Sequence, residues 1–165
     1  MLANALEGIR VVDLSRILAG PWCTQNLADL GADVLKVERP GRGDDTRSWG
    51  PPFVAAPSGE RVAAYFLSCN RGKHSVAADF ADAADREWLL RQIRDADVLV
   101  ENYRVGTLAK YGLDYQSVAA INPRLVYLSI TGFGQSGPFA HKPGYDYIFQ
   151  GMGGLMSYTG RADDD

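Results

Sequence analysis

The sequence lacks the features that mark several large protein classes. Its 165 residues include only two cysteines, Cys23 and Cys69, without the C-x-x-C spacing of zinc or redox sites. We therefore predict reduced, buried thiols and no disulfide framework. The net charge of -3 lacks the basic excess of a nucleic-acid-binding domain, so no nucleic-acid partner is expected.

Long apolar runs are also missing. No stretch approaches the roughly 18 uninterrupted apolar residues of a membrane span. The first eight residues, MLANALEG, have neither the charged start nor the apolar run of a signal peptide. These absences predict a soluble cytoplasmic protein with no membrane partner.

What is present is an ordinary globular composition, with 46% hydrophobic and 22% charged residues. The length suits one compact domain over residues 1–165. Short runs rich in β-branched residues alternate with segments of helical periodicity, which favours an α/β fold with an open, mostly parallel sheet and flanking helices. The predicted strands are Ile9–Leu14, Ala32–Val37, His74–Phe80, Asp97–Asn102 and Leu125–Ile130.

The predicted helices have recognisable ends. Pro21 suits the first turn of a helix that stops at Gly31, and Asp82 is expected to cap the helix that follows it. Shorter helices are expected at Arg61–Ser68, Gly106–Tyr111, Tyr115–Ile121 and Tyr145–Met156. The glycine-rich segments Glu38–Gly59 and Thr131–Gly144 are predicted to be loops without regular structure.

The first strand–helix turn does not have the glycines of a dinucleotide site. A G-x-G-x-x-G turn lets the backbone approach a pyrophosphate, but this turn reads SRILAGP from Ser15 to Pro21. A nicotinamide dehydrogenase is therefore disfavoured.

Basic residues gather after the predicted strands, where an open parallel sheet binds its ligands. They form four groups: Arg39 with Arg42, Arg47, Arg71 with Lys73, and Arg104 with Lys110. Their guanidinium groups suit a local anion site, although a solvated charged surface is the alternative.

Three further features have two interpretations each. Tyr145 begins a predicted helix and either directs its hydroxyl into a pocket or packs as an aromatic anchor. The glycines of Gly151–Gly154 indicate either close backbone approach or a helix end. His74 and His141 lack metal-ligand spacing and are expected to be structural or surface residues.

Several ordered motifs resemble the N-terminal part of the family III CoA-transferases, which include formyl-CoA transferase, carnitine CoA-transferase and α-methylacyl-CoA racemase. The resemblance covers essentially the whole chain. The motifs are LEGIRVVDL from Leu6, AGP from Ala19, LGADVLKVE from Leu30, NRGK from Asn70, DVLVEN from Asp97, ITGFGQSGP from Ile130, and GYD from Gly144 with the following QGMGGLMSYTG.

The resemblance implies a Rossmann-like domain that binds coenzyme A or acyl-CoA as a substrate, with no permanently bound cofactor or metal. It places Ile17 and Leu18 near the thioester and Tyr145 beside the reacting carbonyl. The residues it implies for the nucleotide part are Arg39, Ala78, Asn102, Tyr103, Arg104 and Lys110.

The resemblance also implies the reaction, which is CoA transfer to a carboxylic acid through an aspartyl intermediate. Tyr145 favours a transferase, because the racemases have histidine in the corresponding G-H-D motif; a racemase and a non-catalytic CoA-binding fragment are the alternatives. The catalytic aspartate is expected beyond Asp165, because Asp163, Asp164 and Asp165 correspond at best to the preceding turn.

Family members are longer, interlocked homodimers, and these 165 residues correspond to the N-terminal portion of their large domain. The resemblance therefore implies that the family's small domain and returning C-terminal segment lie outside these residues. The chain is therefore expected to be a truncated product, a fragment or half of a split protein, and to have little activity alone.

Overall fold

The computed structural model describes residues 4–55 and 59–159. The chain forms two compact units, residues 1–130 and residues 131–165. The predicted Asp163, Asp164 and Asp165 lie outside the described residues. That one CoA-binding domain extends over residues 1–165 stays a prediction.

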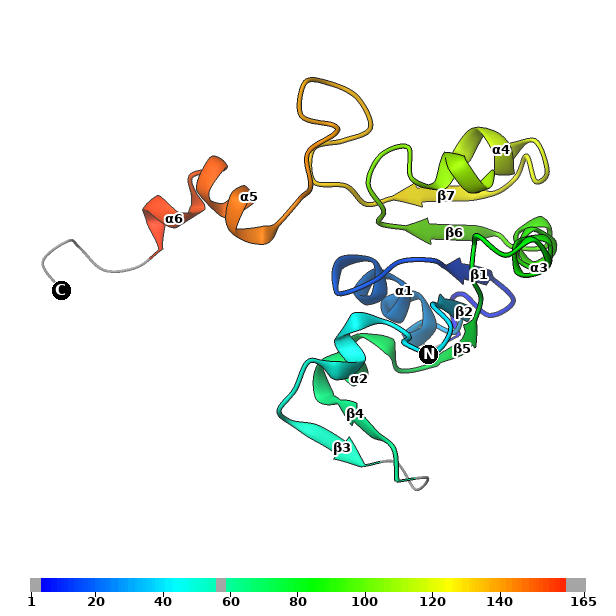
Figure 1. Cartoon of the computed structure of the whole chain (residues 1–165), viewed down its shortest axis with the longest axis horizontal. Helices are drawn as coiled ribbons and strands as arrows, with labels where there is room; N and C mark the ends of the chain where they lie inside the picture. Colours follow the sequence, from blue (N-terminus) through cyan, green and yellow to red (C-terminus); the bar gives the residue numbers. More distant parts are fainter. Residues whose placement is uncertain (1–3, 56–58, 160–165) are drawn as a thin grey trace, which may run out of the picture. The chain divides into compact units, whose positions relative to one another are not determined.

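The first unit is built on a parallel five-stranded sheet, as the β-branched runs predict. Its strands are β1 (Arg10–Asp13), β2 (Asp33–Glu38), β5 (Lys73–Ala77), β6 (Val98–Glu101) and β7 (Val126–Ser129). Their order is β5-β2-β1-β6-β7 (Figure 1), and Val11 of β1 is paired with Val34 and Val98. The strand order reverses between β1 and β6, and ligands bind beside such a reversal, at the carboxyl ends of the strands.

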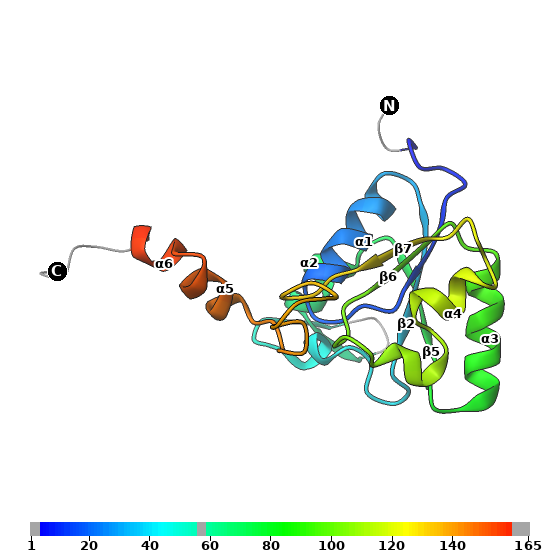
Figure 2. The same ribbon diagram turned by 90° about the horizontal axis from the view of Figure 1, so that it is seen from above.

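Helices cover both faces of this sheet (Figure 2). Helix α1 (Ala19–Asp29) packs on the face that contains Val11, Val34 and Val100. The opposite face, with Val12 and Leu99, is covered by α3 (Ala83–Arg94), 3-10 helix η2 (Leu108–Tyr111) and α4 (Tyr115–Ala119). Adjacent strand residues such as Val11 and Val12 are therefore both buried, which explains why apolar residues are consecutive, and do not alternate with polar ones, in β1 and β6.

The predicted helix ends are confirmed where a side chain or a glycine determines them. The Asp82 carboxylate accepts hydrogen bonds from the backbone N–H groups of Ala84 and Asp85, both at 2.9 Å, and caps α3. Pro21 lies in the first turn of α1, and Gly31 has a φ of 100° just beyond its end.

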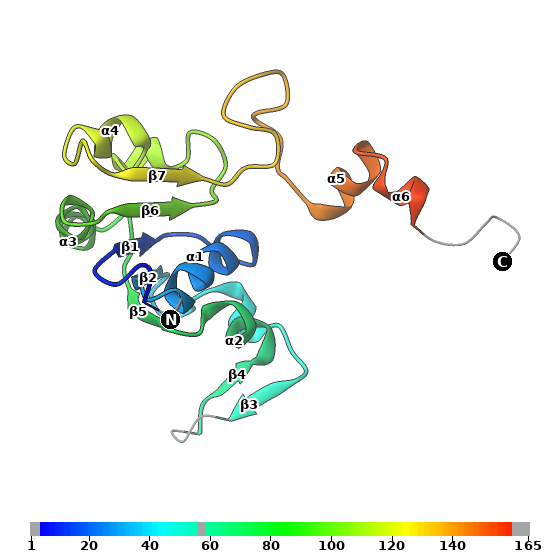
Figure 3. The same ribbon diagram turned by 180° about the vertical axis from the view of Figure 1, so that it is seen from behind.

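The segment after β2 corrects two predictions. Glu38–Gly59 is not a loop throughout, because it contains 3-10 helix η1 (Asp45–Ser48) and strand β3 (Phe53–Ala55). The expected helix Arg61–Ser68 begins instead as strand β4 (Arg61–Ala63), antiparallel to β3, and continues as α2 (Ala64–Asn70). Figure 3 shows this hairpin beside α2. Pairing of Val54 with Val62 and the Arg61 guanidinium over the Phe53 ring stabilise strands too short to show a periodicity.

The second unit contains two helices where one was predicted. Helix α5 (Asp146–Met152) is followed by α6 (Leu155–Tyr158). Gly154 between them has a φ of 78°, a conformation that an α-helix cannot accommodate. The glycines therefore end a helix, and the prediction of one helix over Tyr145–Met156 is wrong.

Candidate functional site

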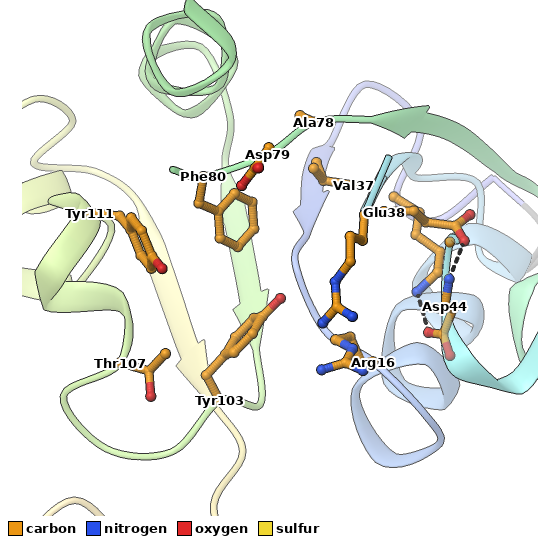
Figure 4. A pocket seen from close by; sticks show the side chains of 13 residues that line it. Arg16, Val37, Glu38, Asp44, Ala78, Asp79, Phe80, Tyr103, Thr107 and Tyr111 are labelled. Carbon is orange, nitrogen blue, oxygen red and sulfur yellow. Dashed lines mark hydrogen bonds and ion pairs between the residues drawn. The ribbon is translucent and has the colours of Figure 1, made fainter. Parts of the chain in front are cut away.

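A cavity of about 170 Å³ lies at the carboxyl edge of the sheet. Residues that follow β1, β2, β5 and β6 meet there, although they are far apart in the sequence (Figure 4). The lining residues are Arg16, Lys36, Val37, Glu38, Arg39, Gly43, Asp44, Ala78, Asp79, Phe80, Tyr103, Thr107 and Tyr111.

Three aromatic rings form one side of the cavity (Figure 4). The ring of Phe80 makes edge contacts with Tyr103 and Tyr111, each with centroids 6.0 Å apart. Burial raises the pKa of Tyr103, and the nearby charges of Arg16 and Arg39 partly offset this. Aromatic rings beside two cations suit a ligand that combines a planar ring with anionic groups.

The two arginines of the cavity differ in their partners. Arg16 forms an ion pair with Asp45, which also lies 3.4 Å from a guanidinium nitrogen of Arg42. Among the described residues no carboxylate is paired with Arg39, whose side chain is exposed. Arg39 therefore brings a positive charge without an ion-pair partner among the described residues to a cavity that is also lined by the Asp79 carboxylate.

The buried carboxylate of Glu38 holds the loop that contains Arg39 through hydrogen bonds to residues further along that loop. Glu38 accepts two hydrogen bonds from Arg47, at 2.7 and 2.6 Å, and others from the Ser75 hydroxyl and the Asp44 backbone N–H. Burial by itself raises the pKa of Glu38, but these hydrogen bonds outweigh it and hold the value at about 2.

The depressed pKa of Glu38 predicts a loss of stability in acid. A group whose pKa falls on folding stabilises the protein above its unfolded pKa, and this contribution disappears as the pH falls through its folded pKa. The window for Glu38 runs from its ordinary 4.5 down to about 2, and the contribution is about 3 kcal/mol. Urea unfolding of the protein and of Glu38→Gln should therefore differ most at neutral pH and converge across this window; a difference that does not change with pH would contradict the assignment.

The turn between β1 and α1 is held by side chains from β2 and from the segments that follow β2 and β6. The Asn102 amide accepts a hydrogen bond from the Arg16 backbone N–H at 2.8 Å and donates one to the Arg16 carbonyl at 2.7 Å. The Ile17 N–H donates to Asp44 at 3.2 Å, and the Lys36 ammonium bonds the Ser15 carbonyl at 3.0 Å. Ile17 has a φ of 72°, which is rare for a β-branched residue and is retained only where surrounding contacts enforce it.

A second buried charge cluster lies beneath this turn. The Asp13 carboxylate accepts hydrogen bonds from Ser15, Thr24 and Lys73, and the Lys73 ammonium lies 3.1 Å from it. Lys73 also donates to the Pro21 carbonyl at 2.8 Å. This cluster joins β1, α1 and β5.

Comparison with known proteins identifies the group to which this fold and cavity belong. The family described as CoA-transferase family III matches residues 6–165. The chain belongs to this family.

Relatives within the family support the assignment. The chain is 57% identical over 96% of its length to succinate–glutarate CoA-transferase of Agrobacterium fabrum and 52% identical over 97% to succinyl-CoA:glutarate CoA-transferase of Mus musculus. A crystal structure of a CAIB/BAIF family protein from Brucella suis superimposes on 96% of the chain with a TM-score of 0.93 and 59% identity. The chain spans only 40%, 36% and 41% of these three proteins.

For this family member, the sequence-predicted residues divide into three groups. Arg39, Ala78 and Tyr103 line the cavity. Ile17, Leu18 and Asn102 belong to the β1–α1 turn and its support, with Leu18 45% exposed. Outside the cavity, Arg104 and Lys110 are exposed residues of the first unit, and Tyr145 is the N-cap residue that precedes α5 of the second unit. Their contacts with CoA stay predictions.

Other predicted basic residues already have carboxylate partners. Arg47 is paired with Glu38, Arg71 with Asp29 and Lys73 with Asp13. These three cations therefore stabilise the fold, and a carboxylate already balances the charge of each.

Sequence reasoning missed Arg16, Phe80 and Tyr111 as lining residues. Arg16 and Phe80 each lie three residues beyond the carboxyl end of a strand, and this position was the signal that could have found them. The contact of the Phe80 and Tyr111 rings depends on how η2 packs, and no local pattern contains this information.

Metal and membrane features have no counterpart in the part of the chain that is described. Residues 4–55 and 59–159 contain no group of three or more His, Cys, Asp or Glu side chains arranged around a metal position. None of their helices has the length and apolar character needed to cross a membrane. Both thiols are free; Cys69 is buried as predicted, whereas Cys23 is only partly so.

Proposed function

We propose that this chain supplies the CoA-binding part of an enzyme that transfers CoA from an acyl-CoA thioester to a carboxylic acid. The observation that carries the proposal is the cavity at the strand reversal, where the unpaired Arg39 lies near an aromatic wall. Relatives named for succinate, glutarate and oxalate support a dicarboxylic acid as the acceptor.

In this proposal the cavity holds the nucleotide part of CoA. Phe80, Tyr103 and Tyr111 contact the adenine ring, while Ala78 leaves room beside them. Arg39 and Arg16 donate charge-assisted hydrogen bonds to the phosphates. Arg104 and Lys110 add positive charge nearby, Ile17 and Leu18 lie toward the thioester, and Tyr145 lies beside the reacting carbonyl.

The covalent step uses an aspartate outside residues 1–165. Its carboxylate attacks the thioester carbonyl and expels CoA as a thiolate, which leaves a mixed anhydride. The thiolate then attacks the aspartyl carbonyl and releases the donor acid. The acceptor carboxylate next attacks the aspartyl thioester and expels the CoA thiolate, which attacks the acceptor carbonyl of this second anhydride, forms the new acyl-CoA and frees the aspartate. Because the proposed aspartate lies outside residues 1–165, these residues alone should show little or no turnover.

We also propose that the enzyme is cytoplasmic and forms a homodimer. The free thiols of Cys23 and Cys69 fit a reducing compartment. Within the second unit, apolar side chains of α5 and α6 are exposed, such as Ile148 at 48% and Leu155 at 51%. Exposed apolar groups of this kind are typical of surfaces that another chain covers.

CoA binding to the chain tests the proposal. Calorimetry should show binding, and Arg39→Ala should weaken it about tenfold, because it removes a hydrogen-bonded cation from the phosphates. Arg94→Ala, which removes an exposed arginine at the end of α3, should leave the affinity unchanged.

Two results would contradict the proposal: no CoA binding, or equal losses for the two arginine variants. The reaction itself is tested in a protein of the relatives' length. Transfer of CoA to succinate or glutarate supports the proposal, whereas deuterium exchange at the α-carbon of a 2-methylacyl-CoA without transfer would indicate a racemase.

A further inference from the structure

We infer that Asn102 is a positioning residue that acts through Arg16 and that Arg16 is a second phosphate-binding residue. This inference rests on the proposed CoA site. Of the described residues that line the cavity, Arg16 is one and Asn102 is not. Both polar atoms of the Asn102 amide bond the backbone of Arg16, at 2.8 and 2.7 Å.

Arg16 is placed to meet an anion. Its guanidinium lies across the cavity from Tyr103 (Figure 4), and its charge acts on the Tyr103 hydroxyl together with that of Arg39. Asp45 accepts a hydrogen bond from one terminal nitrogen of Arg16. A guanidinium has five N–H groups, and no second acceptor for this one is found within residues 4–55 and 59–159, so its other donors can meet an oxygen in the cavity.

The Asn102 contact differs from the other supports of the turn. The Ser15 N–H is bonded to Asp13, and its carbonyl accepts from Lys36. The Ile17 N–H is bonded to Asp44. Only the backbone of Arg16 relies on Asn102, so loss of the amide should displace Arg16 and leave its neighbours in place.

The arrangement therefore assigns Asn102 an indirect role in binding. It connects the end of β6 to the turn after β1, across the reversal of strand order. An arginine side chain is long and flexible, and fixing its backbone limits the positions from which its guanidinium meets the ligand. Affinity for phosphate should depend on Asn102 only while Arg16 is present.

A double-mutant cycle tests this dependence. We expect Arg16→Ala to weaken CoA binding about tenfold and Asn102→Ala to weaken it about threefold to tenfold. The double variant should bind CoA like Arg16→Ala alone. Adenosine, which has no phosphate, should bind the wild type and all three variants within about twofold.

Two further variants separate positioning from folding. Asn102→Asp keeps the acceptor for the Arg16 N–H but places a carboxylate oxygen against the Arg16 carbonyl in place of the donor, so it should lose at least as much CoA affinity as Asn102→Ala. Asn26→Ala makes the same truncation on the exposed part of α1 and should leave the affinity for CoA unchanged. Thermal unfolding of each variant identifies any that does not fold, and Asn102→Asp replaces Asn102→Ala in the cycle if that variant fails.

The outcomes distinguish the inference from the proposed function. Additive losses in the cycle, or an equal loss for adenosine, would show that Asn102 contacts the ligand itself and overturn the inference. Full CoA affinity in Arg16→Ala with a loss in Arg39→Ala would also overturn it, while the proposed function survives. A wild-type chain that does not bind CoA overturns both.

Discussion

Asp44→Ala should lower the free energy of unfolding by about 3–5 kcal/mol, because it leaves a buried lysine without its counter-ion. The Lys36 ammonium lies 3.1 Å from the Asp44 carboxylate, and each side chain is 1% exposed. Asp44 also accepts hydrogen bonds from the backbone N–H groups of Ile17 and Thr46. Urea unfolding monitored by circular dichroism measures the loss.

Two controls isolate the buried charge as the cause. Lys36→Met with Asp44→Leu removes both charges, so this double variant should be more stable than Asp44→Ala although it lacks more polar groups. Glu87→Ala breaks the exposed pair with Arg91 and should cost less than about 1 kcal/mol. A double variant less stable than Asp44→Ala would show that the lost hydrogen bonds, and not the unpaired lysine, dominate.

The sheet was predictable from local sequence because burial on both faces leaves a local signal. In β1 and β2, Val11, Val12, Val34 and Val37 are all buried, and such runs can be read without knowing their neighbours. Asp82 similarly caps α3 through bonds to residues two and three positions away. Strands β3 and β4 gave no such signal, because each has three residues and depends on its partner.

The candidate site was predictable to the level of the sheet edge but not to individual charges. The position of Arg39 after a predicted strand indicates this edge, because parallel strands bring their carboxyl ends together, whereas Ala78 and Tyr103 were implied only by the family resemblance. Which carboxylate a given cation meets depends on tertiary packing. Lys73 was predicted beside Arg71 in a basic cluster, but its ammonium bonds Asp13, which is 60 residues away in the sequence.

Lys73→Met should therefore destabilise the protein by about 3–5 kcal/mol, since it leaves the Asp13 carboxylate buried without its cation. The two side chains are 1% and 0% exposed, and the ammonium also donates to Asn70 at 2.9 Å and to the Pro21 carbonyl. Burial lowers the pKa of Lys73 and Asp13 opposes this shift, as expected for an ammonium enclosed by the fold. Urea unfolding at neutral pH measures the change.

Measurements of stability and of CoA affinity together distinguish a structural role of Lys73 from a role in anion binding. Arg71→Ala removes the neighbouring cation, whose pair with Asp29 is exposed, and should cost less than about 1 kcal/mol. Lys73→Met with Asp13→Leu should recover stability relative to Lys73→Met, because no buried charge is left unpaired. If Lys73 bound phosphate instead, Lys73→Met would unfold like the wild type and lose CoA affinity, since nothing in the fold would then need its charge.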